Sequence, residues 1–322
     1  MSDDTALGTV TGAVAVMRRR RVSQCVSVCV RPHYSRSQAR AVHHTADSSL
    51  VHARSALFDL YGDHLRARGA QAPVAALVRL LAPLGVHPPA VRTAVSRMVR
   101  QGWLEPARID GQPGYALTAR ARRRLDDAAA RIYRTAPDGT PVAAGSEGPG
   151  DWDRHWHLGI LREVPNARRR EQLASQLSFL GWAPLSDGAW VGLRNDAEVD
   201  QILDLEGIAA DRFRAPVEAG APEFARRVWK LDALGASYEA WLIEAKALVD
   251  AAGAETTDEQ AFAVRSELVH EWRKFLFRDP GLPDELLPAD WAGTKAAGFF
   301  DFHAERLSPA AGRFVDHCLT QH

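Results

Sequence analysis

The chain has 322 residues, of which 46% are hydrophobic and 25% charged, the composition of an ordinary globular protein long enough for two or three domains. Its 40 basic residues balance its 40 acidic ones, so its net charge excludes neither an acidic nor a basic partner. No apolar run approaches the roughly 18 residues that a membrane helix needs, and the three cysteines form no disulfide framework. We therefore expect a cytoplasmic protein without a membrane segment.

The charges are distributed unevenly along the chain. Residues 51–135 hold 14 arginines, no lysine and 6 acidic residues, and residues 1–50 hold 7 arginines and 3 acidic residues. The rest of the chain carries the compensating acidic excess. A basic segment attached to an acidic body indicates an anionic partner for that segment, first of all a nucleic acid.

Residues 1–50 show no sustained helical or strand period and are rich in Arg, Ser and Val. We expect a disordered or extended tail, or alternatively a basic arm that contacts DNA phosphates. Cys25, Cys29 and His33 have the donor types of a zinc site, but a fourth ligand at close spacing is missing. We predict no metal and no cofactor.

Residues 51–135 predict a winged helix-turn-helix that binds DNA. Apolar residues recur at helical spacing from about Ala53 until Gly69, a second helix follows Pro73, and a third runs from Pro88 to Gly102. Two short strands, residues 103–107 and 115–117, then flank a polar turn, and an arginine-rich helix follows from Thr118.

The third helix carries two different faces. Its apolar residues, at i, i+4, i+7 and i+8, are Val91, Val95, Met98 and Val99. The opposite face has three cations, two small hydroxyls and no acid: Arg92, Thr93, Ser96, Arg97 and Arg100. Arginine can form paired hydrogen bonds with guanine, and Ser or Thr can contact bases or phosphates. We expect these five residues to read DNA, the alternative being a solvated face.

The turn between the two strands carries Arg108 and Gln112. Wings of this kind contact phosphates or the minor groove, where arginine fits a narrow A-tract. These two residues are therefore further candidates for DNA contact, although a solvated hairpin is an equal alternative.

The remaining sequence predicts an α+β chain with two more domains. Residues 136–150 are rich in Gly, Pro and Ser and read as a linker. Residues 151–217 alternate strands (156–161, 189–193, 212–215) with helices (167–180, 197–205), which predicts a ferredoxin-like central domain. Residues 218–322 predict a helical C-terminal domain for effector binding and dimerisation, with helices at 233–251, 258–277 and 310–319.

An enzyme is the alternative for the central domain. His155 and His157 would share one side of a strand, with Asp151 and Asp153 nearby, and such a set can bind zinc. A metal-dependent nuclease built on a ferredoxin-like domain is thus the second hypothesis. No phosphate-binding loop, G-x-S-x-G elbow or HExxH motif is present, and we expect that the protein is not an enzyme.

Three stretches carry a family resemblance. ARSALFDLYGDHL, LAPLGVHPPAVRTAVSRMVRQGWLEPAR and YALTARARRRL resemble the winged-helix domain of the PaaX family, repressors of phenylacetic acid catabolism. WHLGILREVPNARRREQLASQLSFLGWAPLSDGAWVG resembles the family's central domain, and HEWRKFLFRDPGLPDELLPADWAG its C-terminal domain. The resemblance runs from about residue 53 to the end. It implies a homodimeric transcriptional repressor on a double-stranded DNA operator, released by a small-molecule effector, an aryl-acetyl-CoA thioester.

An acyl-CoA is anionic, so its site needs cations. Two sets are candidates: Arg168, Arg169 and Arg170 at the start of one helix, and His270 with Arg273 one turn apart on another. Aromatic residues could stack on the ligand, and the tryptophans of this region are either such platforms or core. For both cationic sets the alternative is plain surface solvation.

Overall fold

The computed structural model describes residues 46–133, 152–162, 166–194, 197–253 and 255–321, with side chains from residue 52 onward. The expected linker at 136–150 and almost all of the expected tail lie outside these residues, as do Cys25, Cys29 and His33. The described chain mixes helices with two small sheets and is α+β.

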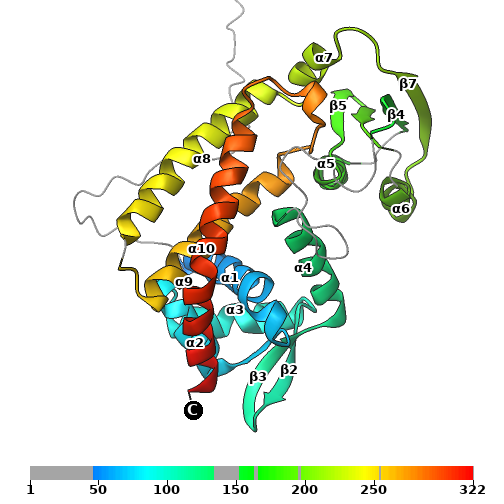
Figure 1. The fold of residues 1–322 in the computed structure, drawn as a ribbon. Helices are drawn as coiled ribbons and strands as arrows, with labels where there is room; N and C mark the ends of the chain where they lie inside the picture. Colours follow the sequence, from blue (N-terminus) through cyan, green and yellow to red (C-terminus); the bar gives the residue numbers. More distant parts are fainter. Residues whose placement is uncertain (1–45, 134–151, 163–165, 195–196, 254, 322) are drawn as a thin grey trace, which may run out of the picture. The chain divides into compact units, whose positions relative to one another are not determined.

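The N-terminal part combines helices with a small antiparallel sheet (Figure 1). In chain order its elements are α1 (Ala46–Asp59), the π-helical segment η1 (Leu60–Leu65), the short 3-10 turn η2 (Arg66–Arg68), β1 (Gln71–Pro73), α2 (Val74–Leu81), the 3-10 turn η3 (Ala82–Leu84), α3 (Pro88–Arg100), β2 (Leu104–Ile109), β3 (Gln112–Leu117) and α4 (Ala119–Ile132). The three strands have the order β1-β3-β2.

The predicted order of elements in this part is confirmed, with shifted ends and one addition. The first helix begins at Ala46, inside the expected tail, and α3 ends at Arg100 rather than Gly102. Strand β1 was not predicted, because three residues ending in proline carry no strand period. It lies so close to β3 that a Cβ on Gly114 would be 2.6 Å from the carbonyl oxygen of Ala72, so only glycine fits there.

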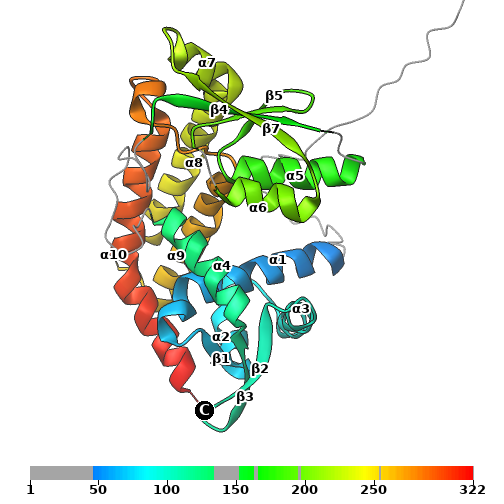
Figure 2. The same cartoon turned by 90° about the vertical axis from the view of Figure 1, so that its right-hand side faces the viewer.

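The central part has the order β4 (His155–Leu161), α5 (Ala167–Phe179), β5 (Ala183–Ser186), β6 (Ala189–Gly192), α6 (Ala197–Glu206) and β7 (Ala210–Pro216). Its antiparallel sheet has the strand order β5-β6-β4-β7. Helices α5 and α6 lie on one face of this sheet (Figure 2). The prediction missed β5, a four-residue edge strand that contains a proline and an irregular register.

The C-terminal part is helical, as predicted. It consists of α7 (Ala221–Val228), α8 (Leu231–Ala252), α9 (Asp258–Trp272), the 3-10 segments η4 (Arg273–Phe277) and η5 (Asp284–Leu286), and α10 (Ala292–Thr320). The prediction of a helix at 310–319 was too short, because α10 has 29 residues and continues through Pro309. Among the described helices, none is by itself long and apolar enough to cross a membrane; α2–η3 and α3 pass such a test only when joined, and they meet at a bend of 119°.

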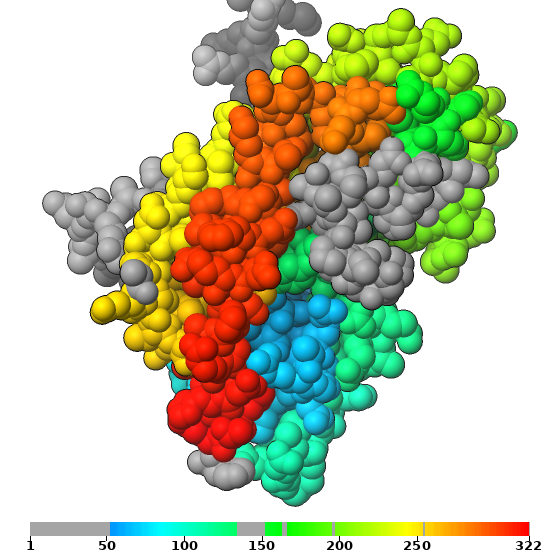
Figure 3. Space-filling model, in the orientation of Figure 1, coloured from blue at the N-terminus to red at the C-terminus, as the bar shows by residue number. Residues whose placement is uncertain are grey.

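The main apolar core of the N-terminal part includes residues from the end of the chain. Leu57, Leu77 and Met98 are fully buried together with Phe262 of α9 and Val315 of α10. In Figure 3 the red C-terminal half of α10 lies directly against the blue surface of the N-terminal part. Burying such side chains contributes about 1.5–3 kcal/mol each, so α9 and α10 are part of the fold that holds α1 to α3.

A buried ion pair lies beside this core. The guanidinium of Arg265 in α9 pairs with the carboxylate of Asp63 in η1, and their side chains are 9% and 5% exposed. Arg265 also donates to the Tyr133 hydroxyl (3.2 Å) and to the Ala304 carbonyl (3.0 Å), and Tyr133 donates to Asp63. Burial lowers the pKa of Arg265 to about 10, which leaves it charged at neutral pH. This network joins η1, α9, α10 and the residue that follows α4.

Replacing Arg265 with methionine removes the cation and leaves the Asp63 carboxylate buried without a counterion. We expect the free energy of unfolding to fall by about 3–5 kcal/mol, measured by urea denaturation followed by circular dichroism. Arg313→Met is the matched control, because it breaks an ion pair with Asp258 that lies at the surface. Equal losses in the two variants would contradict a dominant role for the buried pair.

His64 lies in the same region, with its Nε2 atom 3.1 Å from the hydroxyl of Ser266. Burial, and secondarily the charge of Arg68, lowers the pKa of His64 to about 3 from an ordinary value of 6.5. The unfolded chain therefore takes up this proton first as the pH falls. The stability that neutral His64 contributes is present above about pH 6.5 and is lost between about pH 6.5 and 3.

Replacing His64 with glutamine should flatten the pH dependence of stability in that window, by up to about 1.4 kcal/mol per pH unit. Urea denaturation at several pH values measures the slope for the wild type and the variant. His87→Gln changes an exposed histidine and should keep the wild-type slope. The interpretation fails if His64→Gln keeps that slope as well.

Candidate nucleic-acid interface

Helix α3 separates an apolar face from a basic face. Val91, Ala94, Val95 and Met98 are buried, whereas Arg92, Thr93, Ser96, Arg97 and Arg100 are all exposed. Proline in the first turn starts the helix at no cost in hydrogen bonds. The structure thus places all five predicted side chains on the outside of one helix.

The polar groups of this face differ in what they can still bind. The Thr93 hydroxyl donates to the Pro89 carbonyl (2.9 Å), so its oxygen is left as an acceptor, suited to an amino group of a base and not to a phosphate. Within the part of the chain that the structure describes, Arg92, Arg97 and Arg100 form no ion pair with an acidic side chain. Their charge is therefore directed to solvent or to a ligand.

The second predicted element is the hairpin of β2 and β3. Its two-residue turn, Asp110-Gly111, has positive φ at both positions (50° and 81°), the backbone that a tight hairpin requires. Arg108 is exposed beside this turn, and its Nη1 atom donates to the Gly111 carbonyl at 3.2 Å. Gln112 is half-buried at the start of β3, so both predicted residues lie next to the hairpin tip.

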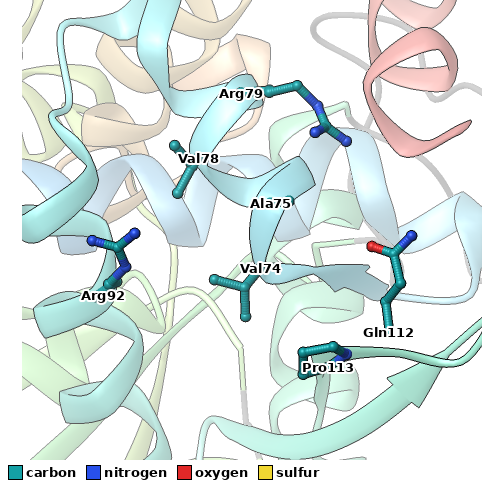
Figure 4. A pocket seen from close by; sticks show the side chains of 7 residues that line it. All are labelled: Val74, Ala75, Val78, Arg79, Arg92, Gln112 and Pro113. Carbon is teal, nitrogen blue, oxygen red and sulfur yellow. The ribbon is translucent and has the colours of Figure 1, made fainter. Parts of the chain in front are cut away.

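A groove of about 570 Å³ joins these two elements across α2. Its lining is formed by Val74, Ala75, Val78, Arg79, Arg92, Gln112 and Pro113 (Figure 4). Arg92 and Gln112, which were predicted separately, thus border the same surface. Sequence reasoning missed Arg79, although it is the only charged residue in the otherwise apolar α2.

Arg79 connects this surface to the end of the chain. Its Nη2 atom donates to the carbonyl oxygens of Cys318 and Gln321, both at 2.7 Å. These carbonyls belong to the last turn of α10 and its C-cap, the end where a helix carries partial negative charge. The C-terminus of α10 therefore contacts the groove through Arg79.

The first set of predicted effector cations lies at the beginning of α5. Asn166 caps this helix by accepting from the backbone N–H of Arg169 (2.9 Å), and the Arg169 side chain pairs with Glu206 (3.0 Å). Arg168 and Arg170 are exposed. Within the described residues Arg168 and Arg170 form no ion pair, so of the three arginines these two are the better candidates for an anionic ligand.

The second set, His270 and Arg273, lies elsewhere, on α9 and η4. Both residues engage Asp59 of α1, His270 through Nδ1 (2.6 Å) and Arg273 through Nε (2.5 Å), and Arg273 also donates to Ser55 (2.5 Å). Asp59 is 8% exposed. The structure therefore uses this set to join the C-terminal helices to α1.

The tryptophans considered as ligand platforms are mainly core residues. Trp182, Trp190, Trp241 and Trp272 are at most 8% exposed. Trp241 and Trp272 pack against each other with ring centroids 4.9 Å apart, an arrangement that stabilises a core by more than its buried area alone.

The histidines considered for a metal site lie beside Asp153 and Arg214. His157 Nε2 is 3.1 Å from the Asp153 carboxylate, and Arg214 Nη2 is 3.2 Å from the same carboxylate and 3.1 Å from His155 Nδ1. A guanidinium in this position supplies the positive charge that a metal would bring. Among the described residues, no three His, Cys, Asp or Glu side chains are arranged to hold a metal ion; Asp151 lies outside them. The geometry does not favour the nuclease hypothesis.

Comparison with known proteins gives matches in all three parts of the described chain. Three family models match in order: PaaX-like protein at residues 52–121, PaaX protein central Cas2-like domain at 149–223, and PaaX-like protein C-terminal domain at 229–317. The transcriptional repressor PaaX of Escherichia coli K12 is 31% identical over 285 residues, which cover 85% of this chain and 86% of that protein.

A solved structure shows a similar fold. An uncharacterized protein from Mycobacterium tuberculosis superposes with a TM-score of 0.52 at 25% identity, covering 83% of this chain and 98% of the other. The three matched models and the extent of the alignment with the E. coli relative agree with each other. The protein belongs to the PaaX family.

Proposed function

We propose that the protein is a homodimeric transcriptional repressor that binds double-stranded DNA through α3 and the β2–β3 hairpin and is released by an aryl-acetyl-CoA effector. The observation that carries the DNA-binding role is the acid-free basic face of α3, exposed along its whole length beside the hairpin. The matched E. coli relative is named as a transcriptional repressor, which supports the same role here. Such a repressor acts where its operator is, in the cytoplasm.

The proposed architecture follows from the element order. We assign α1 to α3 with the sheet β1-β3-β2 to a winged helix-turn-helix, in which α3 enters the major groove. The order β-α-β-β-α-β of the central part, with its antiparallel sheet β5-β6-β4-β7, supports a ferredoxin-like domain. The helical remainder is the proposed effector and dimerisation domain. These roles account for the basic charge of the N-terminal segment and the acidic excess of the rest of the chain.

A dimer is proposed because one recognition helix covers only a few base pairs. Phosphate contacts alone give weak binding that salt abolishes, so specificity normally requires two half-sites held by a two-fold axis. The core that the N-terminal part shares with α9 and α10 supports a direct structural link between the proposed dimer interface and the two DNA-binding parts. An effector that prefers another arrangement of these helices would then misplace both recognition helices.

The base-reading role predicts the behaviour of an Arg97→Ala variant. We expect it to lose about 1–3 kcal/mol of binding free energy on the operator and much less on random DNA, because a guanine contact is specific. Fluorescence anisotropy with both duplexes at one salt concentration measures this. Arg123→Ala, which removes an exposed arginine of α4, is the control for net charge. Equal losses on the two duplexes would make Arg97 a phosphate contact.

For the effector we propose Arg168 and Arg170, since the side chains of His270 and Arg273 already contact Asp59. Phenylacetyl-CoA at 100 times its Kd should stabilise the wild type by about 2.7 kcal/mol, seen as a thermal shift. The double variant Arg168→Ala/Arg170→Ala should bind more weakly in calorimetry.

The control for the effector experiment is Arg226→Ala/Arg227→Ala, which removes two arginines from α7. It should bind phenylacetyl-CoA as the wild type does. Undiminished binding by the α5 double variant would rule out this site, and absence of binding by the wild type would rule out this effector.

A further inference from the structure

Phe179, at the C-terminal end of α5, contacts both of the other parts of the described chain. The guanidinium of Arg131 in α4 lies over its ring, with the Cζ atom 4.0 Å from the ring centroid, and Arg131 Nη1 donates to its carbonyl at 2.8 Å. The ring of Phe277 in η4 packs against the same ring, with centroids 5.5 Å apart. One residue of the central part therefore touches the N-terminal part and the C-terminal part together.

We propose that Phe179 couples effector binding in the central part to DNA binding by α3. The inference rests on the proposed function and deepens its regulation, because it names the contact through which an effector acts on the DNA-binding part. Two series of contacts carry it. Both begin at Phe179, and both end on the helix that packs against α3.

The first series passes through Arg131 and the end of α4. Arg131 precedes Tyr133 by two residues, and the Tyr133 hydroxyl donates to the buried carboxylate of Asp63. Asp63 lies in η1, which continues α1 without a break, and α1 packs against α3. Because a buried carboxylate must keep its hydrogen-bonding partners, a displacement of the end of α4 also displaces η1.

The second series passes through Phe277 and η4. Phe277 belongs to the same 3-10 segment as Arg273, whose Nε atom lies 2.5 Å from the carboxylate of Asp59. Asp59 precedes Asp63 by four residues, so the two carboxylates are about one helical turn apart on one continuous helix. Phe179 is thus connected to this helix at two points, which together determine its position and its orientation.

Helix α5 connects Phe179 to the proposed effector cations. It has 13 residues, with Arg168 and Arg170 in its first turn and Phe179 at its end, and is therefore about 20 Å long. A rigid helix transmits a displacement of its first turn to its last. An anionic ligand that draws Arg168 and Arg170 towards it would move Phe179 relative to Arg131. A movement of about 1 Å is enough to break their hydrogen bond.

The test compares operator affinity with and without phenylacetyl-CoA. For the wild type we expect the effector to raise the Kd for the operator by about 5–150-fold, the usual range of coupling between two sites. Phe179→Ala should bind the operator as the wild type does, but the effector should change its Kd by less than about twofold, because both series of contacts are broken. Phe179→Tyr keeps the ring and should restore the coupling.

Two arginine variants of α4 provide a matched comparison. Arg131→Ala breaks only the first series, so we expect the effect of phenylacetyl-CoA to be reduced but not lost. Arg123→Ala also removes one exposed arginine from α4 and should keep the coupling of the wild type. If Phe179→Ala is unfolded by circular dichroism, Arg131→Ala decides in its place, and full coupling in that variant would contradict the proposal.

A second measurement needs no effector. If α3 and α5 are coupled through Phe179, operator binding should in turn change the end of α5. We expect operator DNA to alter hydrogen exchange of the amides of residues 177–181 in the wild type and not in Phe179→Ala. If Phe179 only stabilises packing, its replacement speeds exchange there, but operator DNA has no effect on these amides in either protein.

The outcomes separate the coupling from the proposed function. Undiminished release of Phe179→Ala by phenylacetyl-CoA, or wild-type α5 amides that do not respond to the operator, would overturn the coupling and leave the repressor role intact. If these amides respond but phenylacetyl-CoA does not release the wild type, the effector assignment fails and the coupling stands. If the wild type binds no duplex DNA, both proposals fail.

Discussion

One buried ion pair, that between Asp63 and Arg265, joins the N-terminal part to the C-terminal helices. Charges removed from water are tolerated only when they are paired and fully hydrogen-bonded, so each partner of Arg265 must stay in place. Those partners are Asp63 in η1, Tyr133 after α4 and the Ala304 carbonyl in α10. A displacement of any of these elements would leave a buried charge unsatisfied. The pair therefore fixes the position of the proposed DNA-binding part on the C-terminal helices.

The contacts between the N-terminal part and the C-terminal helices bear on the proposed regulation of DNA binding. If the N-terminal part were attached only through a flexible linker, other contacts in the proposed dimer would have to set the spacing of its two α3 helices. Here α9 and α10 contribute to the core of the N-terminal part itself, and His270 and Arg273 from the C-terminal part contact Asp59 of α1. At the far end, Arg79 joins α2 to the last turn of α10. A shift of α10 would thus reach the proposed DNA surface directly, through packed side chains and hydrogen bonds.

Sequence reasoning was accurate where a feature depends on local periodicity. The two faces of α3 and the β2–β3 hairpin follow from the spacing of apolar residues and from the Asp110-Gly111 turn. It failed for β1 and β5, which have three and four residues and owe their pairing to neighbouring strands. It also shortened α10, because a proline normally ends or begins a helix, whereas packing against α8 and α9 carries α10 through Pro309.

The sequence by itself determined the family, the α+β class, the basic face of α3 and the hairpin beside it. These features arise from residues close together in the chain, whose spacing and charge can be read directly. Only the tertiary structure decided which distant residues come into contact. Arg265 pairs with Asp63, 202 residues away, His270 and Arg273 contact Asp59, and Arg79 donates to backbone carbonyls at the end of α10. Partners so distant leave no local pattern, because the energy of a buried charge depends on what folding brings beside it.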